Sequence, residues 1–211
     1  SHHCVQKGMI GIETMRDIAH AHGLPFMMDC AAEEDLRKYI ALGADLVCYS
    51  GAKALESTTS GFVTGKRMYV QHVQKQYEGI GRAMKVGKEQ IVGLLEALDQ
   101  FEERDHAAEA ASNEDKVDFL VGQINGIHGL RADKIADEAG RAIYRCRMSF
   151  DPLYTSDLSM EQVNGLLREG DPIVWARTEF LNLGMIDLDP RPIVDGDAEL
   201  IVNRLRKIME A

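Results

Sequence analysis

The sequence has few aromatic residues, a single tryptophan and no long hydrophobic run. No segment approaches the roughly 20 consecutive apolar residues that a membrane-spanning helix needs, so we expect no membrane partner. Basic residues are also in deficit, because 24 Lys and Arg against 34 Asp and Glu give a formal net charge of −10. Phosphate backbones bind to basic surfaces, so this balance argues against a nucleic-acid partner.

Cysteine is scarce too, and the sequence contains no C-x-x-C pair. Cys30 and Cys48 lie in apolar, strand-like runs, where a thiol usually behaves as a small hydrophobic group. His20 and His22 would point apart on a helix, so we expect no metal site there. The cysteine usage favours a reducing compartment, and we expect a cytoplasmic protein. The four cysteines are Cys4, Cys30, Cys48 and Cys146.

What remains is an ordinary globular composition, 45% hydrophobic and 27% charged, with enough apolar mass for one or two small domains. Up to about residue 105 the pattern predicts an α/β region. Its first two strands are wholly apolar and are joined by a helix over 33–43, which is typical of a parallel pair buried on both faces. The predicted strands are 24–29, 44–50 and 61–66, and the other predicted helices are 11–22, 67–77 and 86–103.

The pattern changes after residue 105 and predicts a smaller α+β module. Segments 126–137 and 141–151 alternate between apolar and polar residues, like strands of a half-exposed sheet. Ser159 is a candidate N-cap for the helix that follows it. Two further strands are predicted at 172–180 and 185–190, and helices at 114–124, 158–170 and 197–211.

Functional groups follow the two strands that are predicted to be parallel. Asp29 ends the first strand, Ser50 ends the second, and Lys53 comes just beyond it. Ligands of open parallel sheets bind outside the carboxyl ends of the strands, so these three side chains are expected to face one pocket. The spacing alone fixes no reaction, because the same groups also suit a phosphate site or a structural ion pair.

The runs "MMDCAA", "ADLVCYSGAKAL" and "SGFVTGKR" resemble the fold-type I pyridoxal-phosphate enzymes. They are most similar to the branch that contains selenocysteine synthase (L-seryl-tRNA(Sec) selenium transferase) and D-glucosaminate-6-phosphate ammonia-lyase. The similarity covers most of the chain and is most specific between Asp29 and Lys88. Selenocysteine synthases more often have an acidic residue where Ala52 stands, so the resemblance leans toward the ammonia-lyase.

The resemblance implies pyridoxal 5'-phosphate as cofactor and assigns the residues that would hold it. Lys53 would form the Schiff base and, when desolvated in its pocket, act as nucleophile and proton carrier. Asp29 would pair with the pyridinium nitrogen of the cofactor. Ser50 would donate a hydrogen bond to the cofactor phosphate, while Gly51 and Ala52 would leave room for the ring.

The implied activity is that of a lyase, an α,β-elimination that converts an amino-sugar acid phosphate to a 2-keto-3-deoxy acid phosphate and ammonia. Arg82 and Lys85 are candidates to bind the substrate phosphate, and Arg177 to bind its carboxylate. A selenocysteine synthase-like transferase and a truncated, non-catalytic scaffold or interaction subunit are the alternatives. The resemblance also implies a homodimer or a larger even homo-oligomer.

The resemblance also divides the chain. Residues 1–105 would be the C-terminal portion of the large, mostly parallel cofactor-binding domain with the start of the interdomain helix, and 106–211 a small α+β C-terminal domain. Fold-type I enzymes carry their phosphate-cradling loop and ring-stacking residue in the first half of the large domain, and no segment here matches them. We therefore expect a piece of a longer enzyme that, taken alone, binds the cofactor poorly or not at all.

Overall fold

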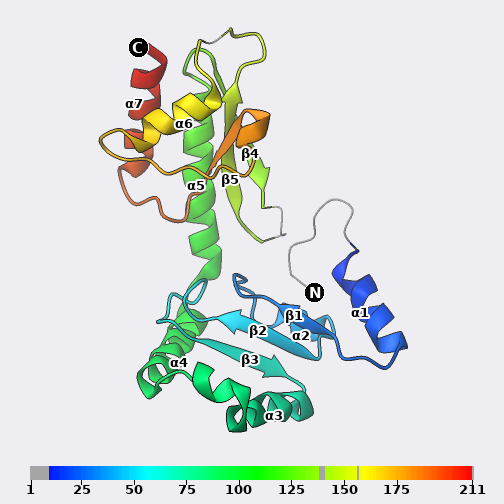
Figure 1. Cartoon of the computed structure of the whole chain (residues 1–211). Coiled ribbons are helices and arrows are strands. Elements are labelled where there is room, and N and C mark those ends of the chain that lie inside the picture. Colours follow the sequence, from blue (N-terminus) through cyan, green and yellow to red (C-terminus); the bar gives the residue numbers. More distant parts are fainter. Residues whose placement is uncertain (1–9, 138–140, 156, 211) are drawn as a thin grey trace. The chain divides into compact units, whose positions relative to one another are not determined.

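The computed structural model describes residues 10–137, 141–155 and 157–210. The chain forms two compact units, Ser1–Arg104 and Asp105–Ala211, which are both drawn in Figure 1. Among the described residues, no helix combines the length and the apolar character that crossing a membrane requires. The assignment of the units to a large and a small enzyme domain stays a prediction.

A three-stranded sheet, in the order β1-β2-β3, forms the centre of the first unit. Its strands are β1 (Met27–Asp29), β2 (Leu46–Ser50) and β3 (Gly61–Gly65). β1 and β2 are parallel, as their apolar character predicts, whereas β3 runs antiparallel to β2. The carboxyl ends of β1 and β2 therefore point to the same edge of the sheet. The sequence predicts a mostly parallel sheet. The described sheet has one parallel pair, β1 with β2, and one antiparallel pair, β2 with β3.

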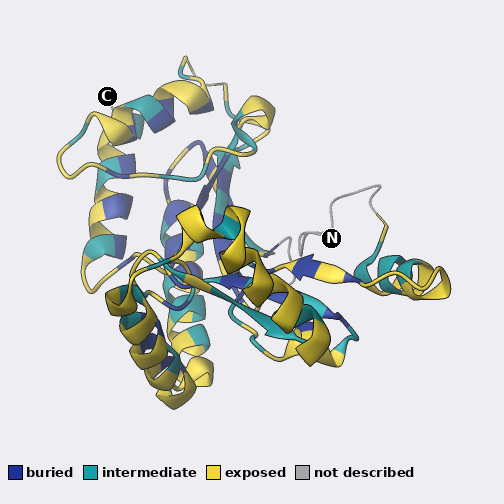
Figure 2. Ribbon diagram, turned by 60° about the horizontal axis from the view of Figure 1, so that its bottom comes forward, coloured by how far each residue is buried: buried dark blue, intermediate teal, exposed yellow. Residues whose placement is uncertain are grey.

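The two faces of this sheet differ in burial. Met28 and Val47 are fully buried and, with Tyr49, they face the core of the unit. The alternate residues on the other face are exposed or half-buried, which is visible along the strands in Figure 2. Because side chains alternate between the faces, this less buried face carries Met27, Asp29, Leu46, Cys48 and Ser50.

Most helices of the first unit lie where the sequence predicts them. They are α1 (Ile12–Ala21), α3 (Arg67–Lys75) and α4 (Lys88–Glu103). Gly23 follows α1 with a φ of 67°, the left-handed conformation that ends a helix. α4 buries Leu94, Ala97 and Phe101, but α3 buries no residue and appears largely exposed in Figure 2. The glycine-rich turn after α3 forms two short 3₁₀ helices, η1 (Gln76–Glu78) and η2 (Ile80–Met84).

The helix predicted over 33–43 is wrong in extent, because only α2 (Lys38–Ala41) is helical. Asp35 Oδ1 accepts hydrogen bonds from the backbone N–H groups of Arg37, at 3.0 Å, and Lys38, at 2.9 Å. Such a local turn satisfies the donors that would otherwise enter the first turn of the helix. The helix consequently starts after Asp35.

The second unit has an antiparallel sheet in the order β4-β5-β6. Its strands are β4 (Leu130–Ala136), β5 (Tyr144–Phe150) and β6 (Met185–Leu188). Buried residues of this sheet form one hydrophobic core with the helices α5 (His106–Ile124), α6 (Met160–Arg168) and α7 (Asp197–Glu210). Ser159 caps α6 in a capping box with Gln162, as predicted. A 3₁₀ turn, η3 (Leu181–Leu183), precedes β6.

Two predictions for this unit need correction. α5 begins at His106 rather than at residue 114, because Asp105 caps it by accepting the Ala108 N–H at 3.0 Å. The alanine-rich first turns bury little, so they lack the apolar stripe that would mark a helix. The strand predicted at 172–180 is absent, and a single bridge between Arg177 and Asp187 replaces it.

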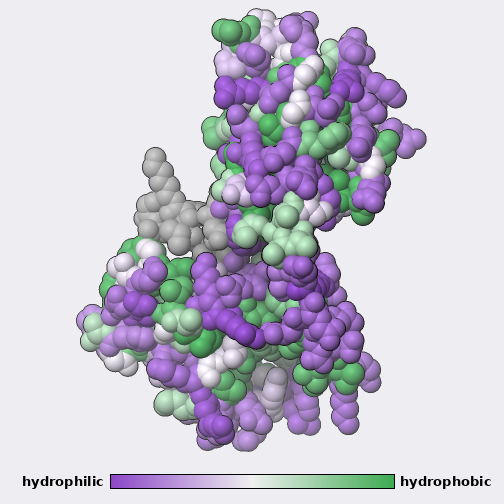
Figure 3. Space-filling model, turned by 180° about the vertical axis from the view of Figure 1, so that it is seen from behind, coloured by the Kyte–Doolittle hydropathy of each residue, from purple (hydrophilic) through white to green (hydrophobic). Residues whose placement is uncertain are grey.

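Hydrophilic side chains cover most of the face that is shown in Figure 3, with smaller hydrophobic areas between them. Of the four cysteines, Cys30, Cys48 and Cys146 carry free thiols, and Cys4 lies outside the described residues.

Candidate functional site

Asp29 ends β1 at the carboxyl edge of the sheet, on its less buried face. The Oδ1 atom of its carboxylate accepts a hydrogen bond from the Ala31 N–H at 3.2 Å and one from the Cys48 thiol at 3.6 Å. The parallel register places Cys48 directly beside Asp29 in β2. Two donors therefore orient the carboxylate, one from the turn after β1 and one from the neighbouring strand β2.

Ser50 and Lys53 lie at the same edge, after β2. Ser50 is half-buried and lies two residues after Cys48, the neighbour of Asp29 in the parallel register. Because side chains alternate along a strand, Ser50 shares the face of Cys48 and Asp29. Lys53 follows in a turn that is closed by hydrogen bonds from Glu56 N–H to Lys53 O, at 2.9 Å, and from Ser57 N–H to Gly51 O, at 2.7 Å. The structure therefore brings Asp29, Ser50 and Lys53 to one edge, as the sequence predicts.

The Lys53 side chain is exposed in this chain. The described residues therefore leave Lys53 in contact with solvent, and its desolvation in a cofactor pocket stays a prediction. A desolvated Lys53 side chain would need to be covered by atoms other than those of the described residues.

Steric contacts explain the glycines of the motif. A Cβ atom at Gly51 would lie 2.2 Å from Ser60 Oγ and 3.0 Å from Leu94 Cδ1. A Cβ atom at Gly61 would lie 2.7 Å from the carbonyl oxygen of Tyr49. Gly65 has a φ of 145°, and its Cβ position is occupied by the backbone of Asp45. Gly51 therefore serves the close approach of β2 to β3, whatever room it also leaves for a ligand.

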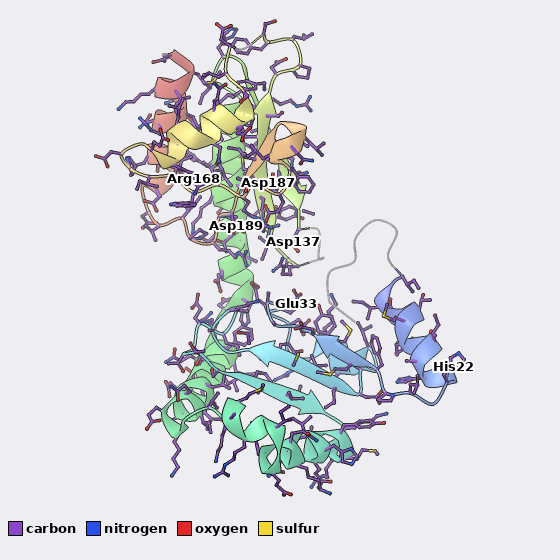
Figure 4. The ribbon with its side chains drawn as sticks, in the orientation of Figure 1. His22, Glu33, Asp137, Arg168, Asp187 and Asp189 are labelled. Carbon is purple, nitrogen blue, oxygen red and sulfur yellow. The ribbon has the colours of Figure 1, made fainter. Side chains whose placement is uncertain are left out.

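A buried polar pair lies directly behind the edge. Glu33, labelled in Figure 4 in the loop after β1, is 5% exposed and accepts a hydrogen bond from the Tyr39 hydroxyl at 3.0 Å. Burial, and then the charge of Glu33, raise the pKa of the Tyr39 hydroxyl. Burial and the same carboxylate raise the pKa of Cys30 to about 12. Both groups therefore stay protonated at neutral pH, and they serve the site as structure rather than as nucleophiles.

The predicted substrate-binding residues are divided between the two units. Arg82, in η2, and Lys85, directly after it, are exposed cations of the first unit. Arg177 belongs to the second unit, where its Nη2 lies 2.7 Å from Glu179 Oε1 and its Nη1 3.8 Å from Asp189 Oδ2. The hydrogen bond with Arg177 lowers the pKa of Glu179.

Arg177 stands beside a cluster of buried charges in the second unit. Arg145 is 1% exposed and contacts Asp137 at 2.6 Å and Asp189 at 3.0 Å. Asp189 also pairs with Arg191 at 2.9 Å, and Asp137 and Asp189 are labelled in Figure 4. Burial opposes ionisation of Asp137, but hydrogen bonds from Arg141 and Arg145 prevail and lower its pKa to about 2.

The sequence pattern did not reveal the contact of Cys48 with Asp29, because it assigned Cys48 to the apolar filling of a strand. The signal was present in the alternation of β2, since Cys48 is two residues before Ser50 and must share its face. The contact with Asp29 additionally needed the parallel register, which the sequence does not specify.

Comparisons with known proteins give a consistent result. The family model "SelA: L-seryl-tRNA selenium transferase" matches residues 10–134. D-glucosaminate-6-phosphate ammonia lyase of Salmonella typhimurium is 45% identical over 210 residues, which are 100% of this chain and 56% of that protein. A 5'-C-glycyluridine monooxygenase-decarboxylase of a Streptomyces species is 35% identical over 98% of this chain and 52% of its own length. The chain thus spans about half the length of these relatives.

An L-seryl-tRNA(Sec) selenium transferase of Solidesulfovibrio magneticus is more distant, at 26% identity over 93% of this chain and 43% of its own. Among solved structures, that of D-glucosaminate-6-phosphate ammonia-lyase superposes with a TM-score of 0.74 over 100% of this chain and 56% of that one. A PLP-dependent aminotransferase of Streptococcus suis superposes with a TM-score of 0.57 at 15% identity, over 99% of this chain and 54% of its own, a likeness of fold alone.

Proposed function

This chain belongs to the SelA family of L-seryl-tRNA selenium transferases, and from that premise we propose that it is part of a pyridoxal-phosphate-dependent ammonia-lyase that acts on an amino-sugar acid phosphate. The observation that carries the proposal is the 45% identity to D-glucosaminate-6-phosphate ammonia lyase, which extends over the whole chain. The products would be a 2-keto-3-deoxy acid phosphate and ammonia.

The residues at the sheet edge fit the proposed cofactor. Asp29 offers a carboxylate whose orientation is fixed by two donors, a suitable partner for a protonated pyridine nitrogen. Lys53 offers an exposed amine beyond the end of β2, and Ser50 offers a hydroxyl on the face of Asp29. When bound, pyridoxal phosphate supplies an aldehyde that condenses with the substrate amine and a ring that stabilises negative charge on the adjacent carbon.

Each residue then has a separate task. The Asp29 carboxylate holds the proton on the ring nitrogen, and the Ser50 hydroxyl donates a hydrogen bond to a phosphate oxygen. The Lys53 amine removes the proton from the α carbon of the substrate. The β-hydroxyl leaves as water, and addition of water to the resulting unsaturated amine releases ammonia and the keto acid, so that no net water is consumed.

Arg82 and Lys85 are proposed to attract the substrate phosphate, and Arg177 to bind its carboxylate. The paired nitrogens of an arginine match a carboxylate in geometry, whereas a lysine acts on a phosphate as a point charge. The exposure of Arg82 and Lys85 supports this assignment, because both cations are accessible to a ligand.

The proposal is tested on the full-length protein with glucosaminate 6-phosphate. We expect ammonia and a 2-keto acid in equal amounts, and a loss of activity of at least about 1,000-fold in Lys53→Ala, because both covalent attachment and proton transfer depend on this amine. Borohydride reduction followed by peptide mapping should label the peptide that carries Lys53. A protein that releases no ammonia, or carries the label elsewhere, would contradict the proposal.

The same experiments separate the two alternatives. A selenium transferase would trap the cofactor on Lys53 but release no ammonia from the sugar acid; Ala52 and the lower identity to selenium transferases favour the lyase. A non-catalytic scaffold would give neither result.

A cytoplasmic location, supported by the free thiols, and a homodimer or larger even assembly belong to the same proposal. Light scattering of the full-length protein measures the assembly.

A further inference from the structure

The Cys48 thiol is the side-chain donor that β2 directs at Asp29. Its Sγ lies 3.6 Å from Asp29 Oδ1, and the two residues are direct neighbours in the parallel register of β1 and β2. The Cys30 N–H donates to the Cys48 carbonyl oxygen at 3.0 Å, which locks the two strands together at this level. Backbone pairing therefore places these two side chains next to each other on one face of the sheet.

Two donors converge on one carboxylate oxygen. The Ala31 N–H reaches Asp29 Oδ1 from the turn after β1, while the thiol reaches it from β2. A carboxylate held from a single side can still rotate about its Cβ–Cγ bond, but donors from two directions define its plane. A fixed carboxylate plane matters for Asp29, because the carboxylate oxygen must accept the hydrogen bond of the ring N–H in the plane of the ring.

We propose that Cys48 is a positioning residue, whose thiol holds the Asp29 carboxylate in the orientation that pairs with the ring nitrogen of the cofactor. The inference rests on the proposed function, since it gives Asp29 that task. Cys48 would act only through Asp29 and would touch neither cofactor nor substrate.

The state of the thiol agrees with this role. Burial, and then the charge of Asp29, raise the pKa of Cys48 above its usual 9.0. The thiol consequently carries its proton at neutral pH and can donate it in a hydrogen bond. A nucleophilic role would need the opposite shift in pKa.

The test uses the full-length protein and three variants of one position. Cys48→Ala removes the donor and leaves space, Cys48→Val removes the donor and fills that space with methyl groups, and Cys48→Ser keeps a donor. Cys146→Ala is the matched control, because Cys146 is a fully buried thiol of the other unit. For each apo protein, titration with pyridoxal phosphate gives Kd, and the ¹⁵N shift of bound, ring-labelled cofactor reports protonation of the ring nitrogen.

We expect Cys48→Ala and Cys48→Val to weaken binding of pyridoxal phosphate roughly 3- to 10-fold, which corresponds to the net loss of one ordinary hydrogen bond, because a thiol is a weak donor. Their ¹⁵N shift should move toward that of an unprotonated ring nitrogen. Cys48→Ser should stay within about 2-fold of wild type, because its hydroxyl still donates. Cys146→Ala should leave both readouts unchanged. Should Cys48→Ala fail to fold, Cys48→Val decides, because it also lacks the donor but leaves no cavity.

The inference is overturned if the donor-free variants bind the cofactor as tightly as wild type, or if Cys48→Ser loses as much as they do, since the loss would then not depend on the presence of a donor. In both cases the wild-type protein still binds pyridoxal phosphate, and the proposed function stands. A wild-type protein that binds no pyridoxal phosphate would overturn the proposed function and this inference together.

Discussion

The buried carboxylate of Asp45 pairs with the Lys66 ammonium at 2.6 Å, and so joins the residue before β2 to the residue after β3. Asp45 also accepts a hydrogen bond from the Phe26 N–H at 2.7 Å and lies 2.9 Å from His20 Nε2 of α1. One carboxylate thereby connects α1, the chain before β1 and the end of the β2–β3 pair at which β2 starts and β3 finishes. The lysine of the "GKR" motif has a structural partner, on the end of the sheet opposite to the candidate site.

Replacing Asp45 should make the first unit less stable and less sensitive to acid. Burial alone would raise the pKa of this carboxyl, but hydrogen bonds from Lys66, Phe26 and His20 outweigh burial and lower it from 3.8 to about 2. A lowered pKa in the folded state gives stability that is complete above about pH 4 and is lost as the pH falls toward 2. Asp45→Ala should cost roughly 1–3 kcal/mol at pH 7, mainly because the buried Phe26 N–H loses its acceptor.

Urea unfolding of wild type and Asp45→Ala, at several values between pH 7 and pH 2.5, measures this effect. The difference in unfolding free energy should shrink across the acid range. His20→Ala is the control, because the Lys66 and Phe26 contacts remain and most of the acid sensitivity should remain with them. A difference that stays constant down to pH 2.5 would contradict the assignment.

In the second unit, Arg145 should be far more important to stability than its exposed neighbour Arg191. Arg145 is almost fully buried between Asp137 and Asp189, whereas the Arg191 side chain is 39% exposed. Arg145→Met leaves the two carboxylates without their shared cation and should cost roughly 3–5 kcal/mol. Arg191→Ala should cost less than about 1 kcal/mol, as for exposed ion pairs. Equal losses in chemical denaturation would show that burial of Arg145 does not set its contribution.

Three glycines of the first unit should respond differently to alanine. Gly61→Ala would press a Cβ atom against the Tyr49 carbonyl, which cannot move without breaking the β2–β3 pairing. Gly51→Ala meets first the Ser60 hydroxyl, a side chain that can rotate away. We expect losses of roughly 1–3 kcal/mol for Gly61→Ala, as for overpacked cores, and less for Gly51→Ala. Gly93→Ala, inside α4 with only ordinary contacts, should gain about 0.5–1 kcal/mol. Thermal melts that reverse this order would contradict the steric account.

The sequence was most informative where hydrophobic pattern and local capping agree. The apolar runs predict β1 and β2 and their parallel direction, and Ser159 predicts the start of α6. It failed where a local hydrogen bond overrides the pattern, as at Asp35, which delays α2. It failed again at Asp105, which starts α5 in a stretch with no apolar stripe.

The candidate site shows the same division. The placement of Asp29, Ser50 and Lys53 at one edge follows from the strand ends alone, because the parallel topology brings those ends together, while their roles stay a prediction. Cys48 needs the register between two strands, and the Arg145 cluster needs the meeting of β4, β5 and the chain after β6. Such contacts join segments that are distant in the sequence, so they depend on tertiary packing and cannot be predicted from the residue pattern of one segment.

If Arg177 binds the substrate carboxylate, Arg177→Lys should raise KM for glucosaminate 6-phosphate more than it lowers kcat. The guanidinium presents two parallel donors to a carboxylate, and a lysine presents a point charge, so the loss should be about 10-fold in KM with kcat changed less than about 3-fold. Arg191→Lys is the matched control, because Arg191 contacts Asp189 of the same cluster but was not assigned to the substrate. Steady-state kinetics of the two variants in the full-length protein decide the question. An equal rise of KM in both would mean that the cluster as a whole, and no single clamp at Arg177, determines substrate affinity.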